Sequence, residues 1–234
     1  MTAVCIHTDP ACLAHDPGPE HPEQVGRLQV VLDALRDRCA VPLEWRPAPQ
    51  ASQEQLLLAH TPGHVAALLA ACPAEGLHRL DPDTLMSPGS YTAALHAAGA
   101  VCAAVDGVMG RDCQRAFCAV RPPGHHALAD QAMGFCLFAN IAIGALHARH
   151  RHGLERVAVV DFDVHHGNGT EAILAGVEGM LYISTHQHPL YPGTGATTPE
   201  GVDNILDLPL EAGCDGRRLL AVMETIADFS RVEG

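Results

Sequence analysis

The sequence predicts an α/β fold with a mainly parallel sheet. Short β-branched and apolar runs alternate with longer segments whose apolar residues recur at helical spacing. Residues 156–162, RVAVVDF, form a continuous apolar run of the kind expected for a strand that is covered on both faces. Hydrophobic residues make up 47% of the 234 positions and charged residues 18%, which favours a packed core over a disordered chain.

The predicted elements follow one another without a linker or an internal repeat, so we expect a single domain over residues 1–234. Strands are expected at residues 4–7, 43–45, 115–120, 156–162 and 180–185. Helices are expected at residues 23–39, 61–72, 90–109, 140–151, 168–175 and 216–229. Pro22 is expected in the first turn of the first helix. His147, His150 and His152, near the end of the fourth, are expected to form a solvated face.

Composition excludes several classes of protein. Lys and Arg number 14 against 27 Asp and Glu, a formal charge of −13, which argues against nucleic-acid binding because phosphate contacts need clustered basic residues. The most apolar stretch, residues 135–146, has 12 residues and falls short of the ~20 that a membrane span needs. The first residues lack the pattern of a secretory leader. Nine cysteines without a C-x-x-C pair indicate free thiols in a reducing cytoplasm.

Metal-ligating residues follow directly after the apolar run. Residues 157–170 read VAVVDFDVHHGNGT, and alternation along an extended chain puts Asp161, Asp163 and His165 on one side. Ligands of open α/β sheets bind beyond the carboxyl ends of strands. Carboxylate oxygen and imidazole nitrogen are ligands of Zn²⁺ and similar ions. Because such groups next to a buried strand are costly unless paired or metal-bound, the segment predicts a metal site rather than a solvated strand end.

Two further segments are weaker indications of a functional site when each is taken alone. A stiff Pro-Pro-Gly turn at residues 122–124 presents His125 and His126 side by side, and adjacent imidazoles can transfer protons. Tyr191 lies in a Gly/Pro loop that could reach the same edge of the sheet. A histidine pair or such a loop is common on protein surfaces, so both matter only if they lie beside the first segment.

Together these segments resemble the zinc-dependent histone deacetylase and acetylpolyamine amidohydrolase family, which shares its fold with arginase. RPPGHHA at residues 121–127 and DFDVHHGNGT at residues 161–170 carry the resemblance. HPEQVGRL at residues 21–28 and LDPDTLMSPGSYTAALHAAGA at residues 80–100 extend it over nearly the whole chain. The resemblance implies a three-layer arginase/deacetylase-type fold with a mainly parallel sheet.

The resemblance also implies a reaction, in which water activated by one Zn²⁺ ion hydrolyses the acetyl amide of an acetylated lysine or polyamine. The catalytic residues implied are His125, His126, Asp161 and Asn168. His126 would be the general base and His125 its electrostatic or acid partner. A neutral amide at Asn168, rather than a carboxylate, looks like the class II branch of the family and should help to keep His126 neutral.

The remaining site residues are implied in the same way. The metal ligands would be Asp163 and His165. A structural potassium ion would be held by Asp161, Asp163, His165, Ser184 and Thr185, partly through backbone carbonyls. Gly134, Phe135 and Tyr191 would line a narrow tunnel for the acetylated side chain, and Arg27 would lie beneath the site, near the exit for acetate.

The sequence departs from the family pattern in its last third. The family's third metal ligand, an Asp in a G-F-D motif, and its oxyanion-stabilising Tyr, in a G-G-Y motif, are both missing. We therefore expect a fold that is incomplete because C-terminal strands are missing, as in a truncated deacetylase. The alternatives are a catalytically inactive remnant and an arginase-type ureohydrolase, although the latter's D-x-H-x-D pattern is replaced here by D-x-D-x-H-H. Oligomeric state is left open.

Overall fold

Two three-stranded parallel sheets organise the computed structural model, which describes residues 3–217, 220, 221 and 224. The first sheet has the order β2-β1-β5, from β1 (Val4–Thr8), β2 (Leu43–Pro47) and β5 (Ala116–Cys118). The second has the order β6-β7-β8, from β6 (Val157–Asp161), β7 (Met180–Gln187) and β8 (Ile205–Leu210). A short antiparallel hairpin joins β3 (His78–Arg79) to β4 (Leu85–Met86). The α/β fold with parallel sheets is thus confirmed, but the strands fall into two sheets instead of one.

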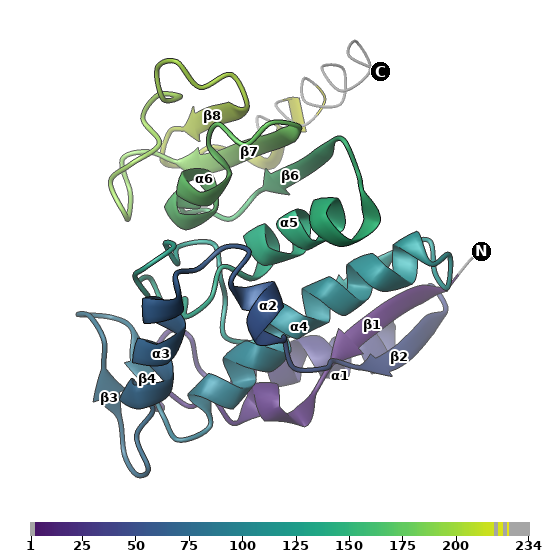
Figure 1. Ribbon diagram of the computed structural model, residues 1–234, viewed down its shortest axis with the longest axis vertical. Coiled ribbons are helices and arrows are strands. Elements are labelled where there is room, and N and C mark those ends of the chain that lie inside the picture. The colour runs from purple at the N-terminus through teal and green to yellow at the C-terminus, as the bar shows by residue number, and fades with distance from the viewer. Residues whose placement is uncertain (1–2, 218–219, 222–223, 225–234) are drawn as a thin grey trace.

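Helices fill the space between the two sheets (Figure 1). The helices are α1 (Gly26–Arg38), α2 (Gln53–Leu56), α3 (Pro62–Ala71), α4 (Ser90–Met109), α5 (Asn140–His152) and α6 (Asn168–Leu174), with a 3₁₀ turn at Pro10–Leu13. α4 packs against β1 and β5, α5 packs against β6, and the two helices pack against each other. Thr61 opens α3 as its spacing predicts, because its hydroxyl accepts a hydrogen bond from the His64 N–H.

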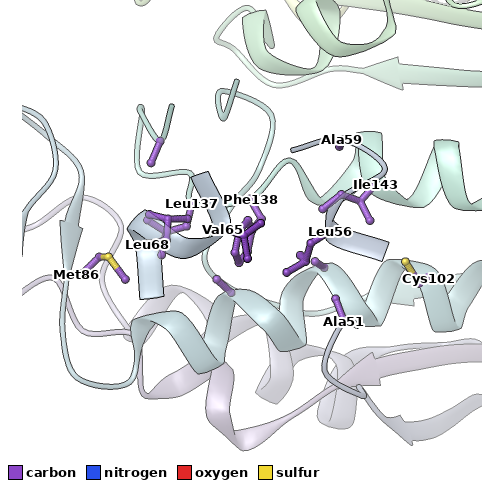
Figure 2. Packing of buried hydrophobic residues seen from close by; sticks show 13 residues of the cluster. Ala51, Leu56, Ala59, Val65, Leu68, Met86, Cys102, Leu137, Phe138 and Ile143 are labelled. Carbon is purple, nitrogen blue, oxygen red and sulfur yellow. The ribbon is translucent and has the colours of Figure 1, made fainter. Parts of the chain in front are cut away.

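Small residues let α4 lie at the centre of the molecule. A Cβ at Gly144 of α5 would lie 2.2 Å from Val101 Cγ1 of α4, so the close approach of these helices requires a glycine. Leu56, Phe138 and Ile143 belong to the largest apolar cluster, which packs along α4 (Figure 2). α4 is long and apolar enough to cross a membrane, but nearly half of it is buried inside the protein, as in a core helix.

Three expectations need correction. The strand at residues 156–162 is not covered on both faces: Val160 is 37% and Phe162 72% exposed, because α5 packs on only one face of β6. α1 begins at Gly26, not at residue 23, because Glu23 turns inward to bind Arg121, so Pro22 precedes the helix. β8 was not predicted. Most of the helix expected at residues 216–229 lies outside the described residues.

Candidate active site

The loops that follow β5, β6 and β7 bring the candidate residues together. The backbone N–H groups of Gly169 and Thr170, at the start of α6, donate to the His125 carbonyl at 2.9 and 3.1 Å. A Cβ at Gly169 would lie 2.3 Å from the Ala127 carbonyl oxygen, so this approach requires a glycine. These bonds join the segment after β5 to the segment after β6, which no pairing of strands does in the described part of the chain.

His125 is paired with a carboxylate. Its Nδ1 lies 2.9 Å from Asp161 Oδ2, and the Tyr182 hydroxyl donates to the same oxygen at 3.2 Å. Burial opposes ionisation of Asp161, but the hydrogen bond and charge of His125 hold the pKa of this carboxyl below its usual range. The Asp161 carboxylate therefore stays ionised beside the His125 imidazole.

His126 is paired with an amide. Its Nδ1 lies 2.8 Å from Asn168 Oδ1, which can only accept, so Nδ1 carries the proton and Nε2 the free electron pair. Burial, together with the neighbouring His125, lowers the pKa of His126 to about 4. Its ring lies 4.0 Å from that of His125, centroid to centroid. The two adjacent imidazoles therefore have different partners, a carboxylate behind His125 and an amide behind His126.

Aromatic and glycine residues surround this pair. The Tyr191 ring stands perpendicular to the His126 ring, with centroids 5.1 Å apart, and also contacts the His165 ring at 6.0 Å. Gly134 has φ +56°, and a Cβ there would lie 2.4 Å from His126 Cδ2. Phe135, at φ +69°, is held by a hydrogen bond from its N–H to the Thr84 hydroxyl and by an edge contact with the His21 ring. The sequence analysis did not single out Thr84 or His21 as site residues.

Asp163 and His165 supply two donors of the kinds that zinc prefers. Asp163 Oδ1 lies 3.1 Å from His165 Nδ1, close to the spacing of about 3.3 Å between neighbouring ligands of a tetrahedral zinc ion. Their residue types and this spacing fit half of a zinc shell. No third Cys, His, Asp or Glu donor of the described residues joins them within 4.8 Å. Catalytic zinc sites normally have three protein ligands, so the donor set present here is partial.

Three of the five residues expected to hold potassium, Asp161, Ser184 and Thr185, are neighbours across β6 and β7. Asp161 pairs in register with Ser184, and the Thr185 hydroxyl lies 3.5 Å from the Asp161 carbonyl oxygen. Ser184 and Thr185 are fully buried. The potassium site itself stays a prediction.

A comparison with known families decides what this arrangement belongs to. A family model described as the histone deacetylase domain matches residues 21–230. The chain belongs to the histone deacetylase family. The crystal structure of the HDA15 HD domain superposes with a TM-score of 0.82 at 33% identity, covering 91% of this chain and 64% of that one.

Named relatives in the histone deacetylase family include bacterial and archaeal proteins. A histone deacetylase-like amidohydrolase of Pseudomonas aeruginosa is 45% identical over 183 residues, which are 78% of this chain and 47% of that protein. A probable deacetylase of Archaeoglobus fulgidus is 35% identical over 236 residues, which are 97% of this chain and 64% of that protein. The chain thus spans between about half and two thirds of the length of these deacetylase-family relatives.

Arg27, expected beneath the deacetylase-type site, is exposed on α1. The buried arginine of this region is Arg121, which the sequence analysis did not single out. Its Nε donates to Glu23 Oε1 at 2.6 Å, and its Nη1 donates to the carbonyls of Cys12 and His15. Arg121 directly precedes the Pro-Pro-Gly turn, so its buried pair with Glu23 anchors the loop that carries His125 and His126.

A second set of residues that sequence reasoning missed holds the Tyr191 loop. His166 Nδ1 lies 2.8 Å from the Thr194 hydroxyl, and His186 Nε2 lies 2.8 Å from the Gly195 carbonyl. His166 Nε2 faces two carboxylates, Glu171 at 3.0 Å and Asp207 at 3.2 Å. Burial disfavours the charged form of His166, but hydrogen bonds to these carboxylates raise the pKa of His166 to about 9. The sequence signal for this cluster was the second histidine of DVHHG, which directly follows a proposed metal ligand.

Proposed function

We propose that this chain carries the catalytic histidines of a zinc-dependent deacetylase that hydrolyses an N-acetyl amide of the acetyl-lysine or acetylpolyamine type. The supporting observation is the pairing of adjacent imidazoles with different partners, His125 with Asp161 and His126 with Asn168. Hydrolysis of an amide by water needs one group that removes a proton and one that delivers a proton to the leaving amine. This pair offers both.

His126 would take the proton of the attacking water. It is neutral, because its pKa is lowered to about 4, and its Nδ1 is fixed as a donor to Asn168, which leaves Nε2 free to accept. His125, hydrogen-bonded to Asp161, would in its protonated form stabilise the developing oxyanion and protonate the amine as it leaves. Tyr191, Phe135 and Gly134 would line the approach for the acetylated side chain.

Asp163 and His165 would hold the zinc ion. When bound, zinc supplies Lewis-acid polarisation of the acetamide carbonyl and a water of lowered pKa. The substrate class, the zinc dependence and a cytoplasmic location all belong to this proposal; the nine free thiols support the location.

A specific observation favours one alternative, a chain that binds metal weakly and does not catalyse amide hydrolysis. Among the described residues, no third Cys, His, Asp or Glu donor lies within 4.8 Å of the donor atoms of both Asp163 and His165. A zinc ion with two protein ligands binds far more weakly than one with three. Under this alternative the histidine pair would be intact while the metal would be lost.

Metal content and turnover distinguish the two functions. We expect the purified chain, supplied with zinc, to hydrolyse an acetyl-lysine reporter, and His126→Ala to lower kcat by roughly a hundredfold or more. His150→Gln, an exposed histidine of α5, is the matched control and should leave the rate unchanged. Folded protein that shows no turnover even at saturating zinc would contradict the deacetylase proposal and support the inactive alternative.

A further inference from the structure

Two helices that carry none of the candidate active-site residues bring three metal-ligating side chains together. Asp106 lies on α4, and His147 and His152 lie on α5. The sequence predicted these histidines to form a solvated face, but His147 is buried, at 6% exposure. The Nε2 atoms of His147 and His152 lie 2.8 and 2.7 Å from the same oxygen, Asp106 Oδ1.

The three side chains converge on one point from different directions. Their donor atoms all lie within 4.8 Å of one another, and the planes of the two imidazoles meet at 85°. Ligands of tetrahedral zinc stand about 3.3 Å apart, so each N···O separation would need to widen by only about 0.5 Å to admit the ion. Side-chain rotation alone can supply such a change.

The C-termini of two helices lie at this place. Asp106 is in the last turn of α4 and His152 is the last residue of α5, so the negative ends of two helix dipoles meet here. The Asp106 carboxylate lies at the same place, 2.8 Å from His147 Nε2. Its side chain is 47% exposed, which leaves a path for an ion and room for water as a further ligand.

The other group of this kind in the described part of the chain is His166, His186 and Asp207. Its imidazole nitrogens are already occupied: His166 by Thr194 and two carboxylates, His186 by Ser184 and Gly195. The hydrogen bonds that this group makes to the Tyr191 loop account for its arrangement. The group on α4 and α5 holds no loop.

We propose that Asp106, His147 and His152 form a second metal site, which binds one Zn²⁺ ion and fastens α4 to α5. Two imidazoles and one carboxylate match the nitrogen and oxygen ligands of zinc, and the open position would be filled by water. This site is independent of the proposed deacetylase function.

Zinc titration in a variant that lacks the first site tests the proposal. In the Asp163→Asn/His165→Gln variant of this chain, competition against a chromogenic chelator should give one zinc ion per chain. His147→Gln and His152→Gln keep an N–H donor for Asp106 but lose the imidazole ligand, and each should weaken zinc binding by at least roughly tenfold. His150→Gln, an exposed histidine in the same turn, should leave the affinity unchanged.

Two further readouts keep the test decisive. Co²⁺ should give the intense visible absorption of a tetrahedral site in the same background, and His152→Gln should remove it. Zinc should also raise the Tm of the background variant but not that of its His152→Gln derivative. His152 ends α5, so this substitution leaves the helix interior intact. Absence of bound zinc, or binding that both glutamine variants retain, would overturn the proposal.

Discussion

At the scale of single residues, the site depends on close contacts that only particular side chains allow. His125 and His126 carry the same imidazole, but Asp161 lies behind one and Asn168 behind the other, and burial is the main cause that lowers the pKa of His126. Gly134 illustrates the same dependence through space alone, since its missing Cβ is what lets the His126 ring lie against the backbone.

Gly134→Ala should displace the His126 ring. The new methyl group would lie 2.4 Å from His126 Cδ2, in addition to the cost of φ +56° for a residue with a Cβ. Gly76→Ala is the matched control, because Gly76 has φ +68° and open space around its Cβ position. Chemical denaturation should show a loss of about 1 kcal/mol for Gly76→Ala and an additional ~1–3 kcal/mol for Gly134→Ala. Equal losses would contradict the steric argument.

At the scale of elements, the Tyr191 loop is positioned by the ends of β6, β7 and β8. His166 follows β6, His186 lies on β7 and Asp207 on β8, so the three strands of one sheet each contribute a residue to the cluster that holds the loop. Gly195, at φ +76°, permits the close packing, because a Cβ there would lie 2.5 Å from His186 Nε2.

Thr194→Val should loosen this loop. It removes the hydrogen bond to the buried His166 Nδ1 at nearly constant volume, which should cost about 1–3 kcal/mol. The chain has three tyrosines, so incorporated 3-fluorotyrosine gives three ¹⁹F resonances, of which Tyr191→Phe identifies one. We expect the Tyr191 resonance to shift or broaden while that of Tyr91 stays unchanged. Thr197→Val, an exposed threonine of the same loop, is the control and should move neither resonance.

At the scale of the whole molecule, distant segments are tied together by buried charge. Glu23 and Arg121 are 98 positions apart, and their pair links the segment before α1 to the loop that carries the histidine pair. Burial disfavours the ionised form of Glu23, but hydrogen bonds from His15 and Arg121 hold the pKa of Glu23 below its usual range. The pair is therefore ionic.

Glu23→Gln should destabilise the protein strongly, because it leaves the buried Arg121 guanidinium without a counter-charge. We expect a loss of about 3–5 kcal/mol in the free energy of unfolding. Glu44→Gln removes a similar but exposed partner, that of Arg46, and should cost at most about 1 kcal/mol. Urea titrations of both variants compare the two, and similar losses would show that burial is not what matters.

The sequence by itself determined the α/β class, the strands β1, β2, β6 and β7, most helices and the family, because period and motif are local properties. It also predicted that the histidine pair and the Asp163–His165 segment would meet. Only the tertiary structure decided which residues stand behind them: Arg121 rather than Arg27 is buried, and His166, Thr194 and Asp207 hold the Tyr191 loop. Tertiary contact likewise placed His147 and His152 against Asp106. The physical reason is that a hydrogen bond or ion pair between residues far apart along the chain leaves no pattern in the sequence around either partner, whereas a strand, a helix or a ligand motif does.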